Sequence, residues 1–241
     1  MPNDVRVTFL GGLGEIGRNC LVVEHSGRMI ILDCGIMFPD PEMPGIDLVL
    51  PDFHYLTQNA KKIDGIVITH GHEDHMGGLA FLLREISAPI YSSRLTLSMA
   101  RGRIDEAGLS GRTEFIAVND GERRMIGAFD VEFIPVTHSV PNGFATAFHT
   151  PQGVILHSGD FKLDMTPVDD RRTDLARIGA LADGGGIRLL LSDSTNAEEP
   201  GLHRKRAERR CNSPDNLCRT SQSTYCCRLF RESHPSSATA L

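Results

Sequence analysis

The sequence predicts an α/β fold in which mixed β-sheets form a sandwich covered by helices on both outer faces. Strand-like segments rich in Val and Ile alternate with amphipathic, helix-like segments as far as about residue 200. The early strand-like segments follow one another at hairpin distance, whereas helix-like segments separate the later ones. The sequence contains no internal repeat, so a layered domain is expected in place of a repeat array.

Apolar periodicity locates the elements of this fold. Runs of aliphatic and β-branched residues bounded by glycine predict strands, and apolar residues on one face, such as Leu79, Leu82 and Leu83, predict helices. A run of three glycines at 184–186 is expected to end the last helix. Strands are expected at residues 5–10, 20–24, 29–33, 65–69, 114–118, 130–136, 144–150, 154–157 and 187–191, the last of them buried. Helices are expected at residues 77–86, 95–107 and 173–182.

Length and composition fit one globular domain. The 241 residues are 40% hydrophobic and 23% charged, which suffices for one core. No apolar run approaches the length of a membrane span. Residues 1–6 have no signal-like apolar region, which predicts a cytoplasmic location. The net charge of −6 argues weakly against indiscriminate nucleic-acid binding. Cys20 and Cys34 lie in apolar stretches and are expected to be buried free thiols.

Residues 203–241 differ in composition from the rest. They hold 8 Lys/Arg and 3 Asp/Glu, whereas residues 1–202 hold 17 Lys/Arg and 28 Asp/Glu. Residues 203–241 also show no helical or strand periodicity. We predict a domain over 1–201 and a disordered tail over 202–241, for which out-of-frame translation is the favoured origin. A genuine basic tail for RNA is the alternative. Zinc binding by its four cysteines is disfavoured, because spacings of seven, eight and one residues differ from paired zinc ligands.

One loop concentrates candidate metal ligands. Directly after the predicted strand at 65–69, the sequence reads Thr69-His70-Gly71-His72-Glu73-Asp74-His75. Neutral imidazole and carboxylate are leading ligands for zinc and similar ions. A loop at the end of a strand presents such groups together without burying unpaired polar atoms. A solvated polar loop is the alternative, but the His-x-His-x-Asp-His spacing favours a metal site.

Two further ligands are predicted downstream, again at strand ends. His138 follows the predicted strand at 130–136, and Asp160 follows the one at 154–157. Either residue, taken alone, could be an ordinary turn residue. The histidine cluster at residues 70–75 makes metal binding the favoured interpretation of both. The remaining histidines considered are expected to be surface or core residues, with His157 a candidate for orienting a ligand. They are His25, His54, His149, His157 and His203.

The glycine-rich opening offers a competing interpretation. Gly12, Gly14 and Gly17 follow a predicted strand, and Asp33 closes another strand 21 residues after Gly12. This spacing matches a dinucleotide-binding fingerprint, which needs a helix between the two strands. The interval is mostly strand-like and leaves about six residues for a helix, too few for a crossover. We therefore expect tight turns beside the metal site.

The motifs resemble a known family. The order of the histidines and aspartates is similar to that of the metallo-beta-lactamase superfamily. Flanking motifs resemble more narrowly the ribonuclease J family, and this similarity spans residues 5–201. The flanking motifs lie at 11–19 (GGLGEIGRN), 43–47 (MPGID), 51–52 (PD), 69–79, 159–162 (GDFK) and 192–197 (SDSTNA).

The resemblance implies a metallo-beta-lactamase αββα sandwich that binds two zinc ions, with manganese as an alternative metal. Each implied ligand matches a histidine or aspartate singled out above. The implied ligands are His70, His72 and His138 for one ion, Asp74 and His75 for the second, and Asp160 bridging both.

The resemblance also implies features outside these ligands. Asp193 would donate a proton to the leaving group, and a calcium ion could bind near Gly45 and Asp47. Members of the family enter a beta-CASP domain after the block matching 192–201, then return to complete the sandwich, the last ligand histidine and the RNA channel, and they form homo-oligomers. No segment of this sequence matches those parts, so the sandwich is expected to be incomplete, lacking the beta-CASP domain and the returning strands.

The implied function is metal-dependent hydrolysis of RNA phosphodiester bonds, by 5′-to-3′ exonuclease action, endonuclease action or both. Two ions would activate a water between them, and Asp74, Asp160 and Asp193 would be the catalytic carboxylates. The bound cations would offset the acidic body of the chain.

Two alternatives to this function stay open. One is an acyl hydrolase, such as a thioesterase or lactonase, on the same fold. The other is a metal-binding fragment with little turnover.

Overall fold

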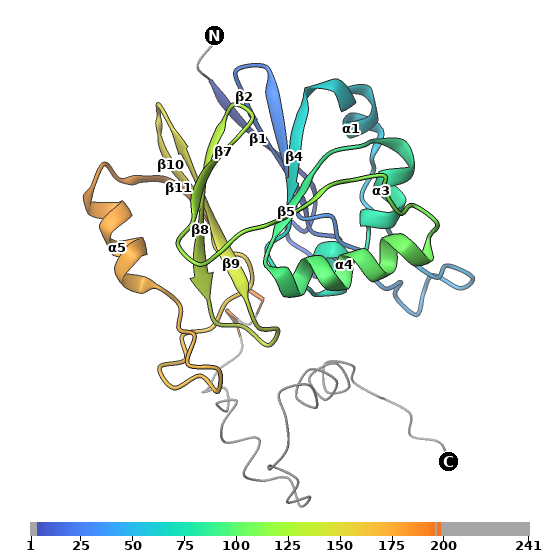
Figure 1. Cartoon of the computed structure of the whole chain (residues 1–241). Coiled ribbons are helices and arrows are strands. Elements are labelled where there is room, and N and C mark those ends of the chain that lie inside the picture. The colour runs from blue at the N-terminus through green and yellow to red at the C-terminus, as the bar shows by residue number, and fades with distance from the viewer. Residues whose placement is uncertain (1–3, 196, 199–241) are drawn as a thin grey trace, which may run out of the picture.

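Two β-sheets, one of six strands and one of five, pack face to face, and helices cover the outer face of each (Figure 1). The computed structural model describes residues 4–195 and 197–198. This is the α/β sandwich that the alternating pattern predicts, so the predicted fold class is confirmed. The predicted tail at 202–241 lies outside the described residues.

The first sheet combines an antiparallel meander with parallel strands. In spatial order it contains β1 (Val5–Gly11), β2 (Cys20–His25), β3 (Arg28–Leu32), β4 (Ile63–Val67), β5 (Ile90–Ser92) and β6 (Phe115–Ala117). The first three strands pair antiparallel, and β3 to β6 pair parallel. Parallel neighbours need crossovers, and helices provide them. These are α1 (His54–Gln58) with the short η1 (Ala60–Lys62), α3 (Leu79–Glu85) and α4 (Arg94–Glu106).

The second sheet is antiparallel except at one edge. In spatial order it contains β11 (Ile187–Leu191), β10 (Gly153–His157), β9 (Gly143–Thr150), β8 (Phe129–Val136) and β7 (Arg123–Ile126). Helix α5 (Leu175–Asp183) covers its outer face, where Ile178 and Leu181 pack against the sheet. Phe133, Phe144 and Phe148 fill the space between the two sheets. This packing fixes the strand ends of one sheet relative to the strand ends of the other.

The strand at 187–191 corrects one prediction. It exists as β11, but the prediction that it is buried is wrong, because Leu189 is 39% exposed and Leu190 is 56% exposed. β11 lies at a sheet edge and pairs only with β10 among the described strands. Apolar composition predicted a strand correctly but could not indicate an edge.

The other predicted elements are confirmed to within a few residues at their ends. Cys20 and Cys34 are buried free thiols as predicted, and burial raises the pKa of the Cys20 thiol to about 12. None of the described helices is long and apolar enough to span a bilayer.

Candidate metal centre

The histidine-rich segment runs from the end of β4 into the short helix α2 (Glu73–Met76), which carries Asp74 and His75, and neighbouring backbone holds it in place. The amide of Asn19 donates to the carbonyl of Asp74 at 3.0 Å, and the amide of Cys34 donates to the carbonyl of His75 at 2.7 Å. Gly35 passes so close that an added Cβ would lie 1.6 Å from the carbonyl oxygen of Asp74. The segments after β1 and β3 therefore fix the loop before any ion binds.

A first donor set is formed by His70, His72, His138 and Asp160, whose candidate ligand atoms all lie within 4.8 Å of one another. His72 Nδ1 lies 3.0 Å from His70 Nε2 and 3.2 Å from His138 Nε2. Asp160 Oδ2 lies 3.9 Å from His70 Nε2 and 3.5 Å from His138 Nε2. Three ring nitrogens and one carboxylate oxygen thus converge on one point.

A second donor set is formed by Asp74, His75 and Asp160, again within 4.8 Å. His75 Nε2 lies 3.6 Å from Asp74 Oδ2 and 3.3 Å from Asp160 Oδ1. The two oxygens of Asp160 therefore face different sets, Oδ2 the first and Oδ1 the second. The sequence placed these six residues at three separate strand ends, and the structure brings all six together.

The charge states suit ligands. Burial and the neighbouring histidines lower the pKa of His70 well below its usual range, and burial lowers the pKa of His138 to about 3. Burial would raise the pKa of Asp160, but a hydrogen bond and the charge of His75 lower it. Burial acts against a charged His75 ring, yet neighbouring carboxylates raise its pKa well above the usual value. The neutral His70 and His138 rings beside carboxylates match the donors of a divalent-metal centre, whereas His75 would lose its extra proton on binding an ion.

Three residues behind the ligands were not assigned roles from the sequence. Asp33 Oδ2 lies 2.8 Å from His75 Nδ1 and accepts a hydrogen bond from the Thr69 hydroxyl at 2.9 Å. Asn19 Nδ2 lies 3.1 Å from His75 Nε2. The sequence signals were present: Asp33 ends a strand, and Asn19 ends the glycine-rich opening. Asp33 was weighed only as part of the nucleotide-binding fingerprint.

The glycine-rich opening makes tight turns, as predicted. β1 and β2 pair antiparallel, with no helix between them. The amide of Gly12 donates to Glu15 Oε1 at 3.0 Å, which closes the first turn. Gly17 has φ +104°, and a Cβ there would lie 3.0 Å from the side chain of Met37. Rejection of the dinucleotide-binding fold is therefore confirmed.

Asp193, the predicted proton donor, belongs to neither donor set. Its amide donates to the Ser158 hydroxyl at 2.9 Å, and its Oδ1 accepts two hydrogen bonds from Thr195, at 2.8 and 2.7 Å. The charges of Asp193 and of the cluster both act on His157. Burial lowers its pKa, while the charges of Asp160 and Asp193 both act to raise it. Asp193 thus stays a candidate for proton transfer.

Gly45 and Asp47 are exposed, Gly45 within a turn, and belong to neither donor set. Within the described ranges, only those two donor sets gather three or more His, Cys, Asp or Glu ligands. Calcium binding at Gly45 and Asp47 stays a prediction.

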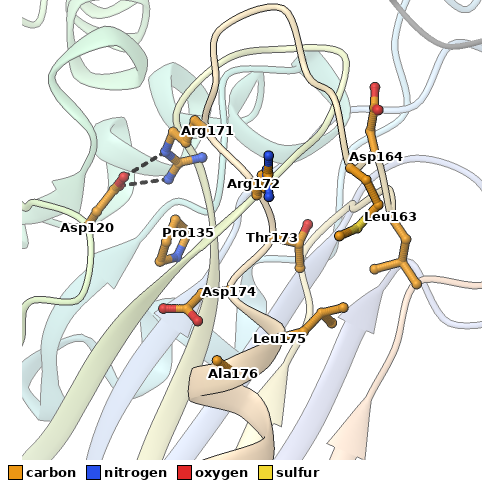
Figure 2. A pocket seen from close by; sticks show the side chains of 11 residues that line it. Asp120, Pro135, Leu163, Asp164, Arg171, Arg172, Thr173, Asp174, Leu175 and Ala176 are labelled. Atoms are coloured by element: carbon orange, nitrogen blue, oxygen red, sulfur yellow. Dashed lines mark hydrogen bonds and ion pairs between the residues drawn. The ribbon is translucent and has the colours of Figure 1, made fainter.

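A cavity of about 440 Å³ lies between the loop after Lys162 and the start of α5, and none of its lining residues belongs to a donor set (Figure 2). Its three carboxylates are already engaged. Asp120 pairs with Arg171 at 2.8 Å, Asp164 accepts from the amide of Thr166, and Asp174 caps α5. We therefore assign this cavity no part in the chemistry.

The fold and the donor sets together define a class of protein. Residues 13–201 match the metallo-beta-lactamase superfamily, and the chain belongs to that superfamily. It is 46% identical over 200 residues to ribonuclease J of Synechocystis sp. and 45% identical over 199 residues to ribonuclease J 1 of Streptococcus pyogenes. These alignments cover 82% and 83% of this chain but 31% and 35% of the relatives, so the chain spans about a third of their length. The resemblance to ribonuclease J found in the motifs is confirmed.

Solved structures show the same fold. Yeast PDE1 superposes with a TM-score of 0.55 at 15% identity, over 77% of this chain and 74% of its own. Zn²⁺-bound PqqB from Methylobacterium extorquens superposes with a TM-score of 0.54 at 15% identity, over 78% and 72%. At such identities the likeness concerns the fold alone.

Proposed function

We propose that this chain is a metal-dependent hydrolase that cleaves phosphodiester bonds in RNA. The observation that carries the proposal is the placement of Asp160, whose two carboxylate oxygens face two adjoining donor sets. Such a shared carboxylate would suit a site for two metal ions. The similarity to proteins named ribonuclease J supports RNA as the substrate.

The residues present fit two ions. His70, His72, His138 and Asp160 would hold one, and the second set would hold the other. Bound ions of this kind supply Lewis-acid chemistry and lower the pKa of water. Zinc suits these nitrogen and oxygen donors, and manganese is the alternative.

Other groups of this chain would act on the substrate directly. Lys162 follows Asp160 by two residues, and its backbone pairs with Thr137, the neighbour of His138, so it brings a cation to this part of an otherwise acidic chain. That cation would attract and orient a phosphate group. Asp193 would hold the proton that the departing oxygen needs. The similarity to proteins named ribonuclease J favours a phosphodiester over an acyl substrate.

The test uses the purified full chain, stripped of metal and reloaded with zinc or manganese. We expect metal-dependent cleavage of a 5′-monophosphorylated RNA and no hydrolysis of a thioester. Mononucleotide products would indicate exonuclease action, and internal fragments endonuclease action. Asp74→Ala should abolish cleavage, whereas Asp183→Ala, at the exposed end of α5, should not.

Three outcomes would contradict the proposal. Full RNA cleavage by Asp74→Ala would remove the second donor set from the chemistry. Thioester hydrolysis without RNA cleavage would favour an acyl hydrolase. Tight metal binding with neither activity would favour the interpretation of a metal-binding fragment with little turnover.

A further inference from the structure

We propose that Ser139 positions His72 by fixing which of its ring nitrogens carries the proton, so that His72 presents Nδ1 to the metal site. The inference rests on the metal centre proposed above. It assigns to Ser139, which is not a ligand, the task of holding a ligand in one form.

The two nitrogens of His72 face different surroundings. Nδ1 lies inside the first donor set, 3.0 Å from His70 Nε2 and 3.2 Å from His138 Nε2. Nε2 points the other way and lies 3.1 Å from Ser139 Oγ. A neutral imidazole has one N–H donor and one acceptor nitrogen. If Ser139 accepts the Nε2 proton, the lone pair on Nδ1 is left for a cation.

The neighbouring histidines, His70 and His75, carry a proton on Nδ1 instead, and different partners hold them in that form. The single hydroxyl proton of Thr69 is donated to Asp33, so Thr69 Oγ1 accepts from His70 Nδ1, 3.0 Å away. His75 Nδ1 lies 2.8 Å from Asp33. Both rings therefore present Nε2 to the site. The contacts of Thr69 and Asp33 go to His70 and His75, whereas the contact at His72 Nε2 comes from Ser139.

Ser139 comes from a distant part of the chain. It lies in the loop between β8 and β9, 67 residues from His72, and directly follows His138. One turn therefore supplies a ligand and the group that orients another ligand on the facing loop. Packing of the two sheets against each other would therefore set which ring nitrogen of His72 carries the proton before an ion binds.

Ring-nitrogen NMR on the metal-free, ¹⁵N-labelled full chain tests this directly. The His72 signals are assigned by comparison with His72→Gln, at about pH 8, where an ordinary imidazole is neutral. We expect the Nε2–H form in the unmodified chain and a mixture of both forms in Ser139→Ala. Metal titration should show affinity at the first site about 10- to 100-fold weaker in Ser139→Ala. Ser139→Thr keeps the hydroxyl and should restore both readouts.

A matched control is Ser192→Ala, whose hydroxyl donates only to the neighbouring carbonyl of Asp193 among the contacts described; it should leave both readouts unchanged. An Nδ1–H form of His72 in the unmodified chain would overturn the proposal. So would a Ser139→Ala variant with the same His72 form and metal affinity, or a Ser139→Thr variant that behaves like alanine. The NMR readout needs neither metal nor RNA cleavage, so a chain that cleaves no RNA would contradict the proposed function and leave this inference standing.

Discussion

Asp33 Oδ2 lies 2.8 Å from His75 Nδ1, and both side chains are buried. The other oxygen of Asp33 accepts the backbone amide of Thr69 at 2.7 Å, so one carboxylate holds the loop and a ligand of the proposed second site together. Asp33 adopts φ +60°, an uncommon conformation for a residue with a side chain. A carboxylate behind a metal-binding histidine fixes the ring orientation and increases its basicity. We therefore infer that Asp33 positions His75 for the proposed second site.

We predict that Asp33→Asn weakens metal binding at the second site by about 10- to 100-fold. Asparagine tolerates the left-handed conformation, so the substitution removes the charge without straining the backbone. Competition titration with a chromophoric chelator measures the affinity. Asp170→Asn is the matched control, because Asp170 has φ +55° but is exposed. Equal affinities of Asp33→Asn and the unmodified chain would show that Asp33 does not support the ligand.

The residues of the two donor sets could be predicted from the sequence, and the groups behind them could not. Four of the candidate ligands share one short segment, and His138 and Asp160 follow strands that periodicity predicts, so strand ends were enough to group them. Asp33 lies 42 residues from His75 along the chain, and Asn19 lies 56. Nothing in local spacing links such positions, since their contact depends on how β1, β3 and β4 align in the sheet.

The missed elements have a physical reason of their own. β5 and β7 have three and four residues, and α1 and α2 have five and four. A periodic pattern needs about two turns or several alternations to be visible, so segments this short carry too little signal. Contacts with neighbouring strands fix them instead, as β5 shows by pairing with both β4 and β6.

Gly35 gives a prediction on stability. Gly35→Ala would place a methyl group 1.6 Å from the carbonyl oxygen of Asp74, so the backbone must move. We expect a loss of about 1–3 kcal/mol or more in unfolding free energy, together with weaker metal binding. Gly102→Ala, in the middle of α4 with nothing within 4 Å, is the same substitution and should instead stabilise the chain by about 0.5–1 kcal/mol. Urea denaturation compares the two, and a neutral Gly35→Ala would contradict the close approach.

Glu132 gives a prediction on pH dependence. Burial would raise the pKa of this carboxyl, but hydrogen bonds from Arg177 and His149 lower it below the usual 4.5. A lowered carboxyl pKa adds stability above the usual pKa, and that stability is lost as the pH falls through the lowered value. Glu132→Gln should cost about 1.5–3 kcal/mol near neutral pH. We expect a loss of unfolding free energy at the lower end of this range, because Arg177 is partly exposed and solvent screens its charge.

The difference between Glu132→Gln and the unmodified chain should therefore shrink as the pH falls below about 4.5. Urea denaturation of the metal-free proteins at several pH values measures it, and removing metal keeps the ligands from adding their own titration. Glu85→Gln, on an exposed face of α3, should show a small difference that does not change with pH. A Glu132→Gln difference that grows in acid would mean that the carboxyl is protonated in the folded chain.

Asp160 and Asp74 should differ in how many ions their loss removes. Asp160 belongs to both donor sets, whereas Asp74 belongs only to the second. We predict that Asp74→Asn keeps one tightly bound ion per chain, held by the three histidines and Asp160, and that Asp160→Asn weakens both sites. Elemental analysis after dialysis counts the ions, with Asp183→Asn as an exposed control. Equal stoichiometry for Asp74→Asn and Asp160→Asn would show that the two sets do not share a ligand, and would remove the observation on which the proposed function depends.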